Sequence, residues 1–388
     1  MWAIRYKYFF LTCLLLGSTP EVHADHDKGI QIKFGGRIKV DTIYNNNSVS
    51  TSRKSKSDLA FTPRSIPLSD TPGDTDLNLR ESRIWSTVTL PMASDVMSGY
   101  IEFDFFDTKR DAAGVSHVTN SPRLRHLYTN YGGWTLGKTY TNFVNMSAYP
   151  EINDANGPVG IHAIRQMLLR FRRELNFAEV AVSLEHGEST FVSSSGNRYQ
   201  VNDDQLPDLV ARISFIESWG QLSFAAMARQ LHTNGRSLTV SNDKSWGGAV
   251  SVAGRIFISG QDNLRFAVSG GNALGRYLSY NAFDDASVSV NGDLDLSEAV
   301  SGHVAYQHWW TGKLRSSLVL GAGYANINTD ITGNNVNKVL ASSTLNLIWS
   351  PDVNSTVGIE WLHGYRQQYD DQDGHIDRIQ FSFIYKFN

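Results

Sequence analysis

The chain has 388 residues, of which 41% are hydrophobic, 11% aromatic and 19% charged, and its 35 basic and 38 acidic residues leave a net charge of −3. Modest charge and bulky apolar residues along the whole chain exclude intrinsic disorder, and the near-neutral balance argues against a general nucleic-acid binder. No stretch contains the run of roughly 18 apolar residues that a membrane-spanning helix requires.

The N-terminus has the features of a secretory signal peptide. Two basic residues precede an apolar stretch at residues 8–17, and residues 22–24 have the small-x-small pattern of a cleavage site. The alternative is a short core helix or a membrane anchor. We expect residues 1–24 to be removed and residues 25–388 to form the mature protein. The mature protein would then lack Cys13, the only cysteine.

After the N-terminus, segments of about ten residues carry apolar residues at alternate positions, which is typical of strands with one apolar face. In the last segment Phe381 and Phe383 lie on one face, whereas Gln380 and Ser382 lie on the other. The expected strands lie near 30–44, 77–91, 97–106, 122–131, 133–141, 163–173, 176–186, 207–216, 218–231, 245–259, 262–273, 294–310, 313–328, 337–351, 354–367 and 378–387.

Short turns and long polar connections alternate between these strands. The long connections are residues 45–76, 107–121, 142–162, 187–206, 232–244, 274–293, 329–336 and 368–374. Alternation of short and long connections is typical of transmembrane barrels. In hydrocarbon, only helices and closed barrels can pair every backbone N–H and C=O group in hydrogen bonds. We therefore predict an all-β fold, a single up-and-down barrel of about 16 antiparallel strands in the bacterial outer membrane, in contact with its lipids.

The same alternation predicts which charged side chains line the interior. If the apolar face contacts lipid, the inward cations are Arg83, Arg125, Arg170, Arg172, Arg212, Arg229, Arg255, Arg265, Arg315, Arg378 and Lys386. The inward acids are fewer, namely Glu102, Asp104, Glu179, Glu185, Asp208 and Glu360. A positive excess in a narrow aqueous pore concentrates anions, so we expect a passive channel that favours small anionic solutes.

We expect eight arginines to select the solute: Arg83, Arg125, Arg165, Arg170, Arg172, Arg212, Arg229 and Arg255. The guanidinium group suits this role because it stays charged and binds carboxylates with two parallel hydrogen bonds. In the alternative interpretation, these arginines form ion pairs with the inward acids of a hydrated inner face and do not select a solute.

The third long connection, near residues 142–163, is unusually rich in apolar and aromatic residues. A merely solvated loop would not need Phe143 or Tyr149, so we expect this loop to fold into the barrel and narrow it. Glu151 and Asp154 would then face the arginine wall. The alternative is a loop that packs on a neighbouring subunit or forms an outer lid.

Short stretches distributed over the first two-thirds of the chain resemble the DcaP-like outer-membrane porins. They are residues 36–41, 80–84, 100–106, 124–128, 137–143, 157–160, 165–166 and 207–212. The resemblance implies a homotrimeric sixteen-stranded porin that passes small anionic organic molecules, dicarboxylates among them. Two features differ from the family pattern: only residues 25–29 precede the barrel, where some members carry a helical extension, and the last strand does not end on an aromatic residue.

Catalytic and cofactor motifs carry little weight in this sequence. Residues 132–139 match the phosphate-binding pattern G-x-x-x-x-G-K-[ST], but their surroundings indicate a strand rather than a helix. His303 and His308 fall on opposite faces of one strand and cannot share a metal. We expect no catalytic residue, no metal, no cofactor and no nucleic-acid partner. The functional alternatives are an outer-membrane lipid hydrolase and a plugged adhesion or receptor barrel.

Overall fold

The computed structural model describes residues 29–48, 56–93, 95–110, 116–119, 121–201, 204–233, 243–278 and 281–387. The expected signal peptide, residues 1–24, lies outside this part of the chain. Among the described residues, no helix is long and apolar enough to cross a membrane.

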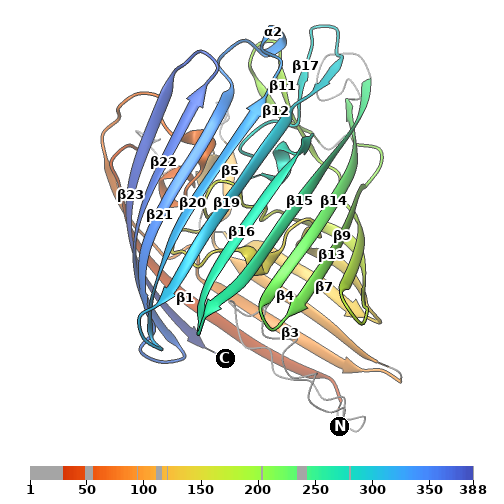
Figure 1. The fold of residues 1–388 in the computed structure, drawn as a ribbon, viewed down its shortest axis with the longest axis vertical. Helices are drawn as coiled ribbons and strands as arrows, with labels where there is room; N and C mark the ends of the chain where they lie inside the picture. Colours follow the sequence, from red (N-terminus) through yellow and green to blue (C-terminus); the bar gives the residue numbers. More distant parts are fainter. Residues whose placement is uncertain are drawn as a thin grey trace.

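Sixteen strands form a closed antiparallel barrel, as the alternating pattern predicts (Figure 1). They are β1 (Gln31–Asn45), β3 (Arg83–Pro91), β4 (Val96–Asp104), β7 (Arg123–Tyr131), β8 (Trp134–Tyr140), β9 (Arg165–Glu174), β10 (Glu179–Glu185), β13 (Asp208–Glu217), β14 (Gly220–Thr233), β15 (Asp243–Ser259), β16 (Asp262–Asn272), β19 (Glu298–Trp309), β20 (Leu314–Asn326), β21 (Asn337–Trp349), β22 (Ser355–Gln368) and β23 (Asp373–Phe387). Each strand pairs with the next in this series, and β23 closes the ring by pairing with β1.

The remaining elements belong to the long connections. They are α1 (Lys56–Leu59), η1 (Pro63–Ser65), β2 (Asp74–Asn78), β5 (Thr108–Arg110), β6 (Ser116–Val118), η2 (Met146–Ala148), β11 (Ser189–Ser193), β12 (Arg198–Val201), η3 (Gly275–Tyr277), β17 (Ala286–Val288), β18 (Leu294–Leu296) and α2 (Thr329–Thr332). Strands β11, β12, β17 and β18 form a small second sheet, at the end of the barrel opposite the short turns (Figure 1).

The structure divides two of the expected strands. The segment expected at 77–91 is interrupted between β2 and β3, where the Asn78 side chain accepts a hydrogen bond from the Arg80 backbone N–H (3.2 Å). Such a side-chain contact favours a turn over an extended strand. The segment expected at 294–310 is interrupted at Ser297, and β18 leaves the barrel wall to pair with β17.

Residues on the barrel strands alternate between exposed apolar and buried polar positions. On β20, Leu318 and Leu320 are about half exposed (49% and 48%), whereas Ser317 and Val319 are buried (2% and 0%). In a closed barrel the exposed set faces outward and the buried set faces the interior. The expected assignment of the two faces is therefore confirmed for this strand.

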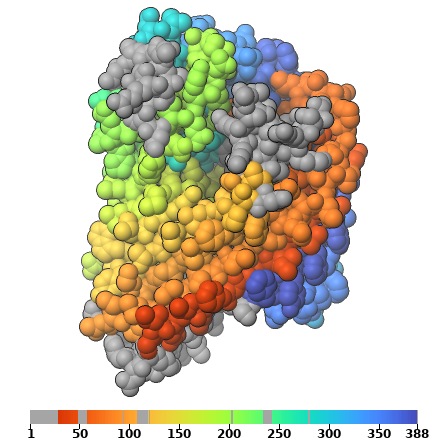
Figure 2. Space-filling model, turned by 180° about the vertical axis from the view of Figure 1, so that it is seen from behind, coloured from red at the N-terminus to blue at the C-terminus, as the bar shows by residue number. Residues whose placement is uncertain are grey.

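The barrel wall is lower on one side than on the other. Strands β3 to β10 have 7 to 10 residues, whereas β14 and β15 have 14 and 17. Figure 2 shows this side of the molecule, where yellow and light-orange atoms lie across the lower half.

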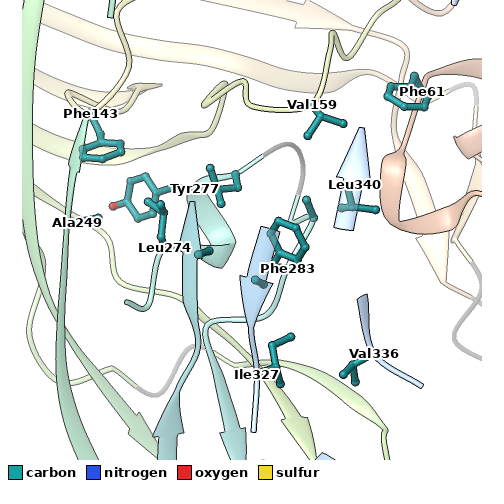
Figure 3. Packing of buried hydrophobic residues seen from close by; sticks show 14 of the residues in the cluster. Phe61, Phe143, Val159, Ala249, Leu274, Tyr277, Phe283, Ile327, Val336 and Leu340 are labelled. Atoms are coloured by element: carbon teal, nitrogen blue, oxygen red, sulfur yellow. The ribbon is translucent and has the colours of Figure 1, made fainter. Parts of the chain in front are cut away.

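The largest apolar cluster is built mainly by the connections and lies inside the ring of strands. Its members include Phe61, Phe143, Val159, Tyr277 and Phe283, and each is at most 1% exposed. Figure 3 shows these side chains surrounded by the strands of the wall. The connections therefore occupy part of the space that the strands enclose.

Candidate functional site

Residues 141–164, which join β8 to β9, hydrogen-bond with buried side chains of the wall. Arg212 of β13 donates to the Val144 carbonyl (2.5 Å), and Arg265 of β16 donates to the Tyr149 carbonyl (2.5 Å). The ring nitrogens of His303, on β19, contact the Ala148 and Gly160 carbonyls at 3.0 and 3.3 Å. The backbone of this segment is thus held by the polar face of several strands.

The next part of the segment is fixed by charged groups. The Glu360 carboxylate on β22 accepts hydrogen bonds from the backbone N–H groups of Asn153 (2.7 Å) and Asp154 (2.9 Å). Arg378 on β23 pairs with the Asp154 carboxylate at 2.6 Å, and Lys39 on β1 donates to the Asn153 carbonyl at 2.5 Å. Charge-assisted hydrogen bonds of this kind are about twice as strong as neutral ones.

A close contact between two glycines lets the segment approach the wall. Gly160 has a φ of +90°, and any Cβ at this position would collide with the backbone of Gly302 on β19. Glycine is the residue that tolerates both the positive φ and the short separation.

Glu151 forms the main ion pair of the segment. Its carboxylate lies 2.5 Å from Arg315 on β20 and also accepts from Gln307 (2.5 Å). Burial alone would raise the pKa of Glu151, but the hydrogen bonds and charge of Arg315 lower that pKa below its usual value. Glu151 therefore stays ionised and partly neutralises this side of the interior.

The partners of the two acidic residues differ from those expected. Glu151 and Asp154 were expected to face the wall that carries Arg165, Arg170 and Arg172. The structure instead pairs them with Arg315 and Arg378. Sequence alternation places these two arginines inside but does not tell which strand the segment reaches, because that contact is tertiary.

Three of the eight predicted selecting arginines are neutralised by buried carboxylates. Arg125 pairs with Glu102 (2.5 Å) and Asp104 (2.6 Å), and Arg83 lies 3.4 Å from Glu102. Arg229 is fully buried and pairs with Asp208 of the wall (3.3 Å) and Asp285 of a connection (2.9 Å). For these three arginines the structure fits the alternative interpretation, in which they satisfy a polar wall.

A register shift explains how two arginines of β7 reach one carboxylate. The pairing of β4 with β7 slips between Glu102 and Phe103, so that β7 carries an extra residue. Arg123 and Arg125 both pair with Asp104, at 2.6 Å each. An extra residue of this kind re-aims side chains locally, which strict alternation along the sequence does not predict.

Other inward cations are not neutralised in this way. Arg172 and Arg212 share the Glu179 carboxylate at 3.6 Å, beyond hydrogen-bonding distance. Among the described residues, no carboxylate lies within ion-pair distance of Arg170, Arg255, Arg265 or Lys386. Arg165 donates to the Tyr140 hydroxyl at 3.4 Å and lies over its ring.

These four cations, Arg170, Arg255, Arg265 and Lys386, lie toward one end of the barrel. Arg170 lies near the end of β9 and Arg255 near the end of β15, while Arg265 lies near the start of β16. All these strand ends adjoin short turns, and Lys386 is close to the end of β23. The half of the interior nearer the short turns therefore contains all four of these cations.

Among the basic residues of the interior that the sequence-based prediction missed are Arg37 and Lys39 of β1. Both contact Glu81 in the connection before β3. The alternation in this strand would have placed them inside, because the apolar residues Ile38 and Val40 occupy its outward face.

A comparison with known families identifies the relatives of this chain. Residues 18–387 match the DcaP outer membrane protein family. The chain belongs to this family. The resemblance seen in the short sequence stretches is thereby confirmed, and the protein is a porin-like channel of the bacterial outer membrane.

Solved structures of DcaP and other porins share the fold. The outer membrane channel DcaP of Acinetobacter baumannii has a TM-score of 0.77 with 21% identity, covering 92% of this chain and 98% of that one. The anion-selective porin from Comamonas acidovorans has a TM-score of 0.56, 10% identity and coverage of 92% and 100%. A trimer form of OmpT from Vibrio cholerae has a TM-score of 0.54, 10% identity and coverage of 93% and 100%. No curated protein matches the sequence.

Proposed function

We propose that this member of the DcaP family is a passive diffusion channel that favours small organic anions such as dicarboxylates. The main observation behind this proposal is that several interior cations have no carboxylate close to them. Arg170, Arg255, Arg265 and Lys386 have no described carboxylate within ion-pair distance, whereas Glu102, Asp104 and Glu151 each contact an arginine. Fixed positive charge in a narrow aqueous pore raises the local concentration of anions.

The 141–164 segment supplies the narrowing that makes this charge effective. Its hydrogen bonds to Arg212, Arg265 and Glu360 hold it on the polar face of the wall, as expected for a loop that folds inward. Phe143, Tyr149, Glu151 and Asp154 would then form a constriction, and Arg170 and Arg255 would lie on the wall that faces it. A narrow passage between low-dielectric walls strengthens the field that a permeating ion meets.

The remaining parts of the proposal concern processing and assembly. We propose that residues 1–24 are a signal peptide and that the mature barrel is a homotrimer, in contact with outer-membrane lipids. The low wall of β3 to β10 supports a trimer, because a neighbouring subunit would cover it. The structure of OmpT mentioned above is described as a trimer form.

The selectivity proposal is tested by removing two interior cations. In the double variant Arg170→Gln and Arg255→Gln, the anion-to-cation permeability ratio should fall. One unit charge about 8 Å from a permeating ion in water contributes about 0.5 kcal/mol, roughly a twofold change in partitioning per charge. The ratio is obtained from reversal potentials in planar bilayers under a salt gradient.

The control removes two cations from the other face of the same strands. Arg173 on β9 and Lys244 on β15 are exposed, so Arg173→Gln with Lys244→Gln changes the net charge equally outside the interior. This control should keep the original reversal potential. An unchanged potential in the interior variant, or an equal shift in both variants, would refute selection by interior arginines.

A further inference from the structure

We propose that the inner face of the low wall (β3 to β10) binds aromatic carboxylates, with the ring of the solute against Tyr100 and Tyr128 and its carboxylate against Arg170. The inference rests on the proposed channel function and names a class of solute that the interior is built to recognise. We call Tyr100, on β4, and Tyr128, on β7, the tyrosine pair.

The tyrosine pair lies on the inner face of the barrel. The Tyr100 hydroxyl donates to the Glu102 carboxylate at 2.6 Å, and Glu102 in turn pairs with Arg125. On the neighbouring strand Leu127 is 51% exposed and faces outward, so the next residue, Tyr128, faces inward. The two tyrosine rings are tilted by 39°, with 5.5 Å between their centroids. They therefore form one continuous aromatic surface.

Solvent reaches the inner face on this side of the barrel. On the opposite strands, β20 to β23, the inward-facing Ser317, Thr344 and Arg378 are only 1–2% exposed. On the low wall both members of the tyrosine pair and Arg170 are partly exposed, and the Arg172 side chain is 51% exposed. Water that reaches inward-facing side chains of a closed barrel is water of the channel. A solute in the channel therefore meets the low wall.

Arg170, on β9, lacks an acceptor for one of its donors. Its Nε is enclosed by protein atoms but has no hydrogen-bond partner among the described residues, and none of their carboxylates lies within ion-pair distance of its guanidinium group. An unsatisfied buried donor costs free energy, so an acceptor supplied by a solute is stabilised there. A guanidinium group also orients a carboxylate, because it can donate two parallel hydrogen bonds to it.

The register of the strands leaves space between Arg170 and the tyrosine pair. On the intervening strand β8, Gly137 is opposite Tyr128, and Thr135 is opposite Arg170. Glycine has no side chain and threonine a short one, so no large side chain of β8 separates the ring from the guanidinium group. Two strand spacings and two residues along the strand put the Cα atoms of Tyr128 and Arg170 about 12 Å apart. This separation suits a solute whose ring and carboxylate are joined directly.

The two halves of the site recognise different parts of the solute. Arg170 recognises the carboxylate, which aromatic and saturated acids have in common. The tyrosine pair recognises the ring, because aromatic rings attract one another in offset or tilted arrangements beyond the effect of burial alone. The site therefore prefers an aromatic carboxylate to a saturated one of the same size and charge.

The test compares two dianions that differ only in the ring. Terephthalate and trans-cyclohexane-1,4-dicarboxylate have the same charge on a ring of six carbon atoms, but only terephthalate is aromatic. Each dianion is added to the unaltered barrel in a planar bilayer, and the concentration that halves the chloride current is measured. We expect this half-blocking concentration to be roughly two- to tenfold lower for terephthalate, because ring stacking adds to carboxylate binding.

Substitutions separate the contributions of the ring and the carboxylate. Tyr100→Leu with Tyr128→Leu should abolish the difference between the dianions, whereas Tyr100→Phe with Tyr128→Phe should retain it, because the rings remain. The control Tyr44→Leu with Tyr385→Leu removes two outward-facing tyrosines, 47% and 43% exposed, and should also retain the difference. Arg170→Gln should raise the half-blocking concentrations of both dianions by similar factors.

Folding and channel activity are checked for every variant. Folding is assessed by the mobility of unheated samples on SDS gels, and Tyr128→Leu alone is used if the double leucine variant does not fold, with a smaller loss of the difference expected. Equal half-blocking concentrations in the unaltered barrel, or a difference that persists in the folded leucine variant, would overturn the inference even in an anion-selective channel. If the unaltered barrel does not conduct or shows no preference for anions, the proposed function itself fails.

Discussion

The arginines inside this barrel occupy two different environments, which differ in whether a carboxylate lies close to the guanidinium group. Arg229 is fully buried between Asp208 and Asp285 and holds connections to the wall. Arg170 and Arg255 have no described carboxylate within ion-pair distance, so their charge remains available to a solute. Burying a charge is costly unless it is paired, which explains why the enclosed arginine has partners and the water-facing ones do not need them.

His162 is a buried histidine whose ring stays neutral in the folded protein. Its ring is 3% exposed and contacts Phe143 edge-on, with 5.5 Å between centroids. Burial, with a smaller contribution from the nearby His303, lowers the pKa of His162 to about 3. The folded protein therefore keeps this ring neutral at pH values where an unfolded chain would protonate it.

The resulting pH dependence has a definite sign. Because the folded pKa lies below the unfolded value near 6.5, stability is lost as pH falls from about 6.5 toward 3, by up to about 1.4 kcal/mol per pH unit. Thermal unfolding in detergent at pH 7.5 and 4.5 should show a smaller acid-induced decrease for His162→Leu than for the unaltered protein. Equal decreases in both would contradict a buried neutral histidine.

Among the secondary-structure elements, β7 contains an extra residue that brings two arginines to one point of the barrel wall. It brings Arg123 and Arg125 to the same carboxylate, Asp104, which is 1% exposed. Without the extra residue, Arg123 and Arg125 would lie on the face opposite to that of the buried His126, outside the barrel and away from Asp104. We therefore expect the pairing of β4 with β7 to depend on this carboxylate.

Replacing Asp104 by Asn should consequently weaken the barrel. Two arginines would lose their shared partner, and breaking a buried pair of this type costs about 3 kcal/mol. The expected result is a lower temperature for the loss of the folded band on SDS gels. Asp373→Asn, which alters an exposed aspartate at the start of β23, is the control and should not change that temperature. Equal thermal shifts in both variants would argue against the role of Asp104.

At the scale of the whole molecule, the uneven wall height matters. The strands of the low side, with 7 to 10 residues, barely reach the roughly 9 to 11 residues that a membrane strand needs. Lys138 lies on the outward face of β8, between Leu127 and Met167, which are both about half exposed. A lysine facing hydrocarbon costs up to about 2–4 kcal/mol, and a neighbouring subunit would relieve that cost.

A labelling experiment compares the two sides of the barrel. Met167 on the low wall and Leu320 on the tall wall are exposed to a similar extent, 52% and 48%. Each is replaced by cysteine in turn and labelled with a fluorophore, in a mature chain that would otherwise have no thiol. Brominated lipids should quench the label at position 320 and spare the label at 167. Equal quenching at both positions would contradict a subunit contact on the low wall.

The barrel could be predicted from the sequence because its signal is local. Alternation along single strands, as in β20 and β23, reports the two faces without knowledge of any partner. The connection between β16 and β17 gives no such signal: Leu274, Tyr277 and Phe283 show no period, and their burial depends on contacts with remote strands. The same holds for the partners of Glu151 and Asp154, and for the departure of β18 from the wall.

The pairing of β1 with β23 has a consequence for how the protein is made. Residues about 340 positions apart hydrogen-bond directly, as the Ser382 hydroxyl does with Asp41 at 2.5 Å. Contacts so remote in sequence form late, since a long loop must close before they are gained. A ribosome that stops early would therefore release a product with an unpaired seam, open to aggregation and proteolysis.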